Sequence, residues 1–198
     1  MTDSPAPAES RAPALLLVIT GAIGLFASLL LSVDKVTQLQ DKIAGKDSVF
    51  ACDFSAWVSC SSVIASPQSE AFGFPNSFIG VIGFAVVLTL GVVWLSGAPT
   101  KGWIWGGLQA GTVFGISFVT WLQHETIYEI GALCPYCMVV WVVMIPLFVG
   151  VTAHSLRLIA PEAGITRFLS NWTVLIVALW YVAVAAAIWF EFGSRIWA

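Results

Sequence analysis

Five long apolar segments constrain this chain more than any other feature. A helix needs roughly 20 consecutive, mostly apolar residues to cross the hydrocarbon core of a bilayer. Segments of this kind lie at residues 13–33, 78–96, 103–122, 134–153 and 172–190. Only 10% of the residues are charged and 59% are hydrophobic, whereas a soluble domain carries about 25% charged residues. The sequence therefore predicts an all-α integral membrane protein with five transmembrane helices, in a single membrane domain over residues 1–198.

The longest connection between these segments, residues 34–77, is predicted to form a lid over one end of the helices. It is far longer than the roughly 2–8 residues that commonly join helices in a bundle. Apolar residues at helical spacing continue the first helix into this connection, and Gly45 is a candidate for its end. Ser66-Pro67 favours the start of a short helix, and Trp57 suits the membrane interface.

The four cysteines form two pairs that are separated in the sequence. Cys52 and Cys60 lie in the long connection, and Cys134 and Cys137 form a Cys-Pro-Tyr-Cys motif that opens the fourth apolar segment. A CxxC motif at a helix N-terminus lowers the thiol pKa and favours a reactive thiolate. A second pair within reach allows electrons to pass by thiol–disulfide exchange. The pattern predicts redox-active cysteines.

Other roles remain open for cysteines at this point. They also form structural disulfides or pack as small apolar side chains. Four cysteines can hold zinc in a tetrahedral site, but the wide spacing of Cys52 and Cys60 and the position at the membrane edge fit such a site poorly. No metal is predicted.

Orientation is predicted from the basic residues near short connections. Residues 1–12 carry a single base, Arg11, and the apolar segment that follows is too long for a secretory signal, so it reads as a retained helix. A cytoplasmic N-terminus puts all four cysteines on the extracytoplasmic side, where disulfides persist. The lysines and arginines divide equally between the two sides, but three of the four on the extracytoplasmic side (Lys35, Lys42 and Lys46) lie in the long connection, where bases count less. The net charge of −3 argues against a nucleic-acid partner, which requires a basic face.

The order of several short motifs resembles the vitamin K epoxide reductase family. These motifs are Cys52-Asp53, Trp57-Val58-Ser59-Cys60, Ser66-Pro67, Phe72-Gly73, Asn76-Ser77, Gly80 and Cys134-Pro135-Tyr136-Cys137. The likeness covers about residues 31–153. It implies four core helices around a quinone site, with a long extracytoplasmic lid loop carrying the first cysteine pair.

The resemblance also implies a role for each cysteine. Cys137 meets the quinone, and Cys134 is its resolving partner. Cys60 exchanges with Cys134, while Cys52 takes electrons from a reduced protein through a mixed disulfide.

Three further residues are expected at the quinone by the same resemblance. Asn76 matches the position that hydrogen-bonds a quinone carbonyl, and Ser66 matches the lid serine. Each also has an ordinary structural reading, Asn76 as a turn residue and Ser66 as an N-cap. Trp141 stands where vertebrate members carry a quinone-contacting tyrosine, and an indole donates only one hydrogen bond.

The implied function is a quinone-dependent thiol oxidase in a bacterial cytoplasmic membrane. It would form disulfides in a separate secreted thioredoxin-like (DsbA-like) protein and reduce menaquinone or ubiquinone. A partner in a separate chain is expected because no thioredoxin-like segment follows the fifth apolar segment. The alternatives are a thiol-driven quinone or vitamin K epoxide reductase and a non-enzymatic membrane protein with structural disulfides. A reductase that carries electrons from the cytoplasm would need a cysteine on that side, and the predicted topology offers none.

Three glycines recur at helical spacing in the third apolar segment, at Gly107, Gly111 and Gly115. Small residues at this spacing let helices approach closely. The ridge predicts close packing within the bundle, or alternatively dimerisation.

Overall fold

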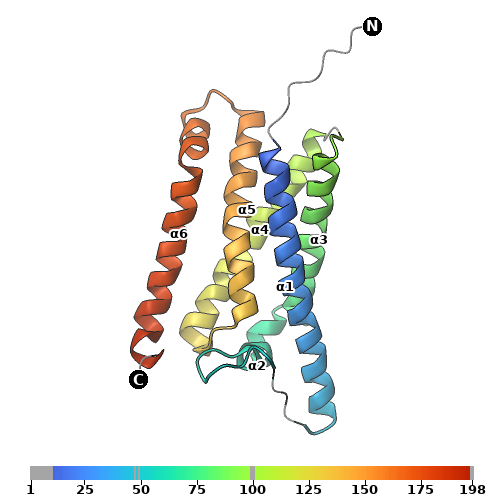
Figure 1. Cartoon of the computed structure of the whole chain (residues 1–198), viewed down its shortest axis with the longest axis vertical. Helices are drawn as coiled ribbons and strands as arrows, with labels where there is room; N and C mark the ends of the chain where they lie inside the picture. The colour runs from blue at the N-terminus through green and yellow to red at the C-terminus, as the bar shows by residue number, and fades with distance from the viewer. Residues whose placement is uncertain (1–10, 47, 49, 99–100, 197–198) are drawn as a thin grey trace.

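The computed structural model describes residues 11–46, 48, 50–98 and 101–196. Five long helices run along the molecule: α1 (Ala12–Ile43), α3 (Asn76–Leu95), α4 (Gly102–His124), α5 (Pro135–Ile159) and α6 (Gly164–Ile196) (Figure 1). Three short elements join them at one end: α2 (Cys60–Ala65), the 3-10 helix η1 (Pro67–Glu70) and the π-helix η2 (Glu125–Ile130). The predicted all-α fold is confirmed.

Among the described residues, four helices are long and apolar enough to cross a membrane, namely α1, α3, α5 and α6. The predicted segment 103–122 does form a helix, α4, of 23 residues. Its glycines, its tryptophans and Gln109 make it less apolar than the other four. One part of α4 packs against α5, and another part lines a cavity that is described below.

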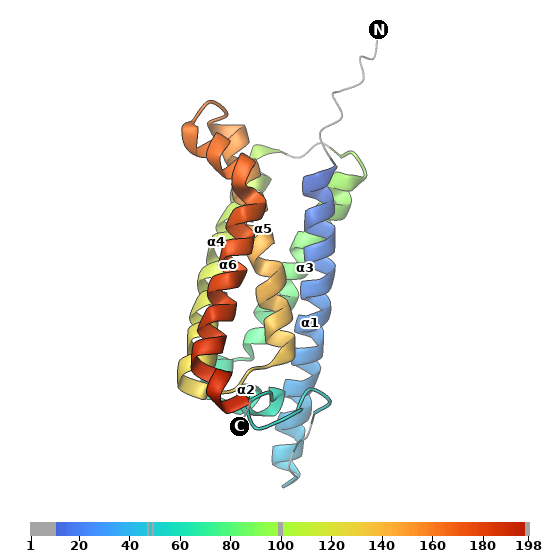
Figure 2. The same cartoon turned by 60° about the vertical axis from the view of Figure 1, so that its left-hand side comes forward.

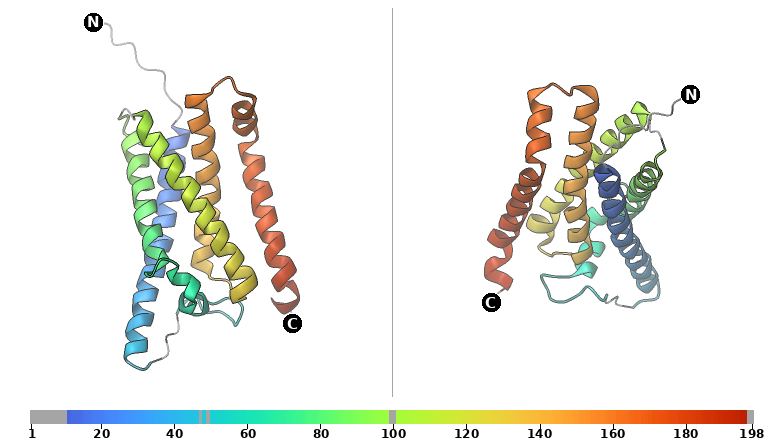
Figure 3. Two further views of the ribbon diagram at one scale, coloured as in Figure 1. Left: turned by 180° about the vertical axis from the view of Figure 1, so that it is seen from behind. Right: turned by 45° about the horizontal axis from the view of Figure 1, so that its top comes forward.

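The helices pack around α5, which contacts α1, α4 and α6. α1 also packs along α3, whereas α6 lies on the outer side of α5, in front in Figure 2. Seen from behind, α4 runs obliquely from beside α3 at one end toward α6 at the other (Figure 3). α3 and α4 therefore diverge toward the end where the lid lies.

Glycines bring α1 and α3 into close contact. A Cβ built on Gly21 would lie 2.7 Å from the Leu88 nitrogen, and one built on Gly91 would lie 2.8 Å from the Val18 nitrogen. A side chain at either position would push the two backbones apart. The close helix packing that small residues permit in membranes is thus found here.

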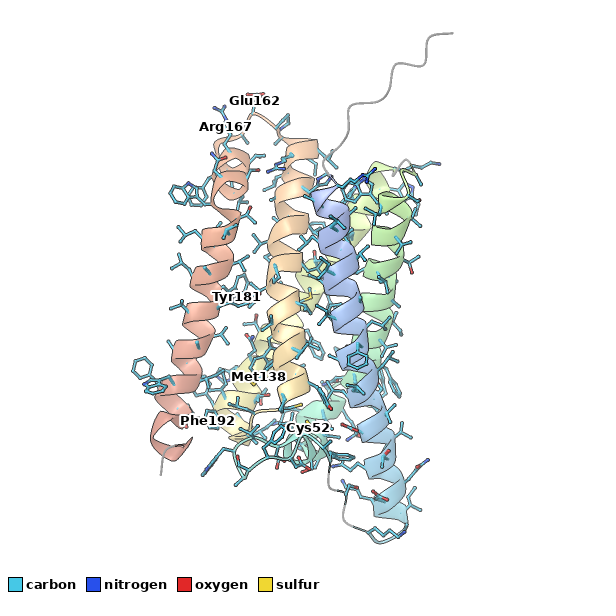
Figure 4. All side chains as sticks on the ribbon, viewed as in Figure 1. Cys52, Met138, Glu162, Arg167, Tyr181 and Phe192 are labelled. Carbon is cyan, nitrogen blue, oxygen red and sulfur yellow. A yellow bond between two sulfur atoms is a disulfide. The ribbon has the colours of Figure 1, made fainter. Side chains whose placement is uncertain are left out.

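The contact between α5 and α6 includes a hydrogen bond at a proline. Pro146 lies inside α5 and has no N–H to donate to the carbonyl of Val142, one helical turn earlier. Tyr181 points from α6 toward α5 (Figure 4), and its hydroxyl donates to that carbonyl at 2.6 Å. An unpaired carbonyl is costly in a hydrocarbon environment, so this bond gives α6 a specific register on α5.

Some helix ends differ from the apolar segments that predict them. α1 continues to Ile43 and is followed by Gly45 with φ of 69°, because the apolar face extends past residue 33. α6 begins at Gly164 rather than near residue 172. Its start is stabilised by the Thr166 hydroxyl, which donates to the Ala160 carbonyl at 2.7 Å.

Candidate active site

All four cysteines gather where the lid meets the start of α5. Cys52 and Cys60 form a disulfide, and Cys134 and Cys137 are free thiols. The Cys134 sulfur lies 3.5 Å from the Cys60 sulfur. Cys60 and Cys134 are completely buried. A thiol beside a disulfide is the arrangement that thiol–disulfide exchange requires.

A short parallel bridge between Val58 and Leu133 brings the two pairs together. The Ser59 N–H donates to the Leu133 carbonyl at 2.9 Å, and the Leu133 N–H donates to the Trp57 carbonyl at 2.8 Å. The residues that follow on each side are Cys60, which begins α2, and Cys134, the N-cap of α5. Their contact is therefore set by backbone pairing.

Asp53 organises the loop between the disulfide cysteines. Its carboxylate accepts hydrogen bonds from the Phe50 N–H at 2.8 Å, the Ser59 hydroxyl at 2.8 Å and the Ser61 N–H at 2.9 Å. Burial raises the pKa of Asp53, but these hydrogen bonds outweigh it and hold the pKa below the usual value of 3.8. The carboxylate is therefore ionised and bonded at neutral pH.

We expect Asp53→Asn to loosen this loop, because an amide accepts hydrogen bonds less strongly than a carboxylate. Hydrogen–deuterium exchange of the Ser61 amide should accelerate about tenfold at pH 7. The lowered pKa means that the native loop keeps its protection above pH 3.8 and loses it as pH falls through the lowered value. The control is Glu129→Gln, at an exposed site on η2. If the Ser61 amide exchanged at the same rate in Asp53→Asn and Glu129→Gln, Asp53 would not be what holds this loop.

The Cys134 thiol is held in a polar setting despite its burial. Its pKa is lowered, first by a hydrogen bond from the Cys137 side chain and then by backbone N–H groups, against the opposing effect of burial. One of these N–H groups is that of Cys137, 3.4 Å from the Cys134 sulfur. Pro135 occupies the first turn of α5, where its missing N–H costs nothing. The N-terminus of α5 thus favours a thiolate at Cys134.

A cavity of about 590 Å³ opens beside Cys137. α1, α3, α4 and α5 form its walls, and α2 and η1 cover the end nearest the cysteines. Of the four cysteines, Cys137 alone lines it. Most of the lining is apolar, which suits a hydrophobic ligand with few polar groups.

The three other sequence-predicted site residues also line this cavity. The Ser66 hydroxyl donates to the Val63 carbonyl at 2.7 Å, so it closes α2 and does not cap η1. The Asn76 amide donates to the Gln68 carbonyl at 2.6 Å and accepts from the Ala71 N–H at 3.1 Å. Trp141 is 4% exposed and forms part of the wall on α5.

Ser77 is a cavity residue to which the sequence assigned no role. Its hydroxyl is buried and has no hydrogen-bond partner among the described residues, and it lines the cavity next to Asn76. A serine after an asparagine at a helix start is common, so the sequence signal was too weak to single it out.

The glycine ridge of α4 has a different role from the predicted one. A Cβ on Gly107 or Gly111 would meet nothing within 4 Å, whereas one on Gly115 would lie 2.7 Å from the Met144 side chain. All three glycines line the cavity. The prediction of close packing is wrong for Gly107 and Gly111, because α4 diverges from α3 and leaves these positions facing open space.

The sequence profile of the vitamin K epoxide reductase family matches residues 15–152. The chain belongs to this family. The match spans α1 to α5 and includes the cysteines, the lid and the cavity, while α6 lies outside it. No curated protein matches the chain. Family membership and the apolar helices together make this protein a multi-pass membrane oxidoreductase, in a family whose members use quinones or vitamin K as electron carriers.

Proposed function

We propose that this family member oxidises the dithiol of a secreted thioredoxin-like (DsbA-like) protein and reduces a membrane quinone, either menaquinone or ubiquinone. The observation that carries the proposal is the line of sulfur atoms from the lid to the cavity. The Cys52–Cys60 disulfide lies 3.5 Å from the Cys134 thiol, and Cys137 opens onto the apolar cavity.

In the proposed relay, a thiolate of the partner attacks Cys52 and releases the Cys60 thiolate. Cys60 then attacks Cys134 in the Cys134–Cys137 disulfide and releases Cys137. The partner's second thiol resolves the mixed disulfide, and the released Cys52 thiolate attacks Cys60, which frees Cys134. The partner leaves as a disulfide, and the CxxC pair holds its two electrons and two protons.

The CxxC pair then passes two electrons and two protons to the quinone, which leaves as quinol, and the Cys134–Cys137 disulfide re-forms. The driving force is the difference in potential between the thiol couple and the quinone, at about 1.4 kcal/mol for each 30 mV in a two-electron step. The arrangement in the structure, with a lid disulfide and two thiols in the CxxC motif, matches the state just before this step.

The cavity has the features that a quinone head group requires. The Asn76 amide carries two N–H donors, one of which bonds the Gln68 carbonyl, so the other is free to hold a quinone carbonyl. The unpartnered Ser77 hydroxyl offers a second donor. Trp141, in place of a tyrosine, offers at most one donor of its own. The Ser66 hydroxyl is turned toward its own backbone, so Ser66 would act by shaping the lid.

The same proposal places the lid end of the bundle outside a bacterial cytoplasmic membrane. The start of α1 and the connection between α5 and α6 lie at the opposite end (Figure 1). Arg11, Lys101, Arg157 and Arg167 fall at or near that end, next to short connections between helices, where basic residues indicate the cytoplasmic side.

Filling the cavity from α4 is expected to weaken quinone binding. Gly111→Phe would place a ring in open space inside the cavity, so the apparent KM for quinone should rise at least about tenfold. The control is Gly106→Phe, because Gly106 lies on the same helix, has equally open space and does not line the cavity. Steady-state quinone reduction by purified protein measures both. If the two variants had the same KM for quinone, the quinone would bind outside this cavity.

The proposal is tested by mixing purified protein in detergent with a reduced thioredoxin-like protein and a soluble quinone. We expect the quinone to be reduced only when the membrane protein and the reduced thioredoxin-like protein are both present. A protein with structural disulfides only would show none, and mild reduction followed by mass spectrometry would find its disulfides unchanged. Addition of vitamin K epoxide to the same assay tests the reductase alternative.

A further inference from the structure

A buried lysine on α1 holds the lid. Lys35 is 5% exposed, and its ammonium donates to the Ile64 carbonyl at 2.7 Å and to the Ser69 hydroxyl at 3.1 Å. The same nitrogen lies 2.8 Å from a carboxylate oxygen of Glu70. An ammonium has three N–H donors, and all three are directed to lid residues of α2 and η1.

The lysine adds to a hydrogen-bond network between α2 and η1, in which the Ser69 hydroxyl also donates to the Ile64 carbonyl at 2.7 Å. Ile64 lies in the last turn of α2, where carbonyls have no partner within the helix. Burying a charge is costly unless it is paired and hydrogen-bonded, so the buried Lys35 ammonium requires these acceptors and is held by them. Gln38, on the same face of α1, adds a bond from its amide to the Ser61 carbonyl at 3.3 Å.

These contacts act on the helix that carries Cys60. The N-terminal end of α2 is held by the Val58–Leu133 bridge, and its C-terminal end is held by Lys35. Because α2 is only six residues long, a shift at one end moves the other. Because α2 is fixed at both ends, the Cys60 sulfur is held against the Cys134 sulfur.

We propose that Lys35 is a positioning residue for the exchange between Cys60 and Cys134, fastening α2 and η1 to α1 so that the two sulfur atoms stay in contact. The inference rests on the proposed relay, in which Cys60 and Cys134 form a transient disulfide. It assigns Lys35 no contact with the partner protein and no chemical step.

The experiment measures the Cys60–Cys134 pair alone. In a Cys52→Ser, Cys137→Ser background, the equilibrium of this pair with glutathione gives its effective concentration. Lys35→Met should lower that value at least about tenfold, because hydrogen bonds to a charged group are lost. Lys35→Arg should keep most of the native effective concentration. The control Lys46→Met, at an exposed position just past α1, should leave it unchanged.

A second background separates positioning from a general loss of structure. In Cys52→Ser, Cys60→Ser protein, the equilibrium of the Cys134–Cys137 pair should change less than about twofold on Lys35→Met, because that pair is local to α5. If Lys35→Met does not fold, the double variant Ser69→Ala, Glu70→Gln removes two acceptors from the lid and should lower the Cys60–Cys134 value several-fold. An unchanged Cys60–Cys134 equilibrium, or equal shifts in both pairs, overturns the inference. Neither assay contains quinone or partner, so the proposed function can fail while this result stands.

Discussion

The Cys137→Ala variant is expected to reduce no quinone above background, a fall of at least about 1,000-fold. Cys137 is the only cysteine that lines the cavity, so no other thiol of the chain reaches a ligand there. Cys134→Ala should be equally inactive, because a lone Cys137 thiol supplies one electron of the two required and cannot re-form a disulfide. The measurement is dithiol-dependent quinone reduction by purified protein.

Two controls make this result specific to the sulfur atoms. Met138→Leu changes the neighbouring side chain, which does not line the cavity, at nearly constant volume and should keep activity within about threefold. Thermal unfolding of each cysteine variant in detergent should show a folded protein. Turnover in either alanine variant at more than a few per cent of the native rate would rule out the CxxC pair as the quinone reductant.

The Cys60→Ala variant is expected to separate the two halves of the relay. Reduction of quinone by a reduced thioredoxin-like protein should fall at least about 100-fold, because electrons that enter at Cys52 then have no route to Cys134. Reduction by a small dithiol such as dithiothreitol should persist within about fivefold. The Cys60 side chain lies against Cys134. Because Cys60→Ala shortens it, dithiothreitol can attack the Cys134–Cys137 disulfide directly.

The comparison of the two electron donors is itself the control. Loss with both donors would mean that Cys60 is needed for folding or for the quinone site. Equal retention with both would mean that the partner bypasses the lid pair. Cys52→Ala should resemble Cys60→Ala with the protein donor, because the mixed disulfide then has no site on the lid.

Several features of the site were accessible from the sequence because they depend on neighbouring residues. Cys134 and Pro135 specify a helix start through local capping and the proline's restricted backbone, and α5 begins there. The apolar periodicity past residue 33 likewise predicted the extension of α1 toward Gly45. These signals act within one or two helical turns.

Contacts between distant residues were not accessible in this way. Nothing in the residues around Val58 announces a bridge to Leu133, and Lys35 reads in sequence as an ordinary charge just past a membrane span. Tyr181 and Pro146 become related only when α6 lies on α5. Each depends on how separate segments are placed in space.

The sequence by itself determined the membrane class, the approximate spans, and the presence of a CxxC pair at a helix start with a second pair upstream. Hydropathy and helix capping are local properties, and a bilayer leaves few folds open to such a chain. The tertiary structure alone decided which sulfur atoms touch and what the glycines of α4 are for. A small residue is equally compatible with close packing and with open space, and the divergence of α4 from α3 decides between them at Gly111.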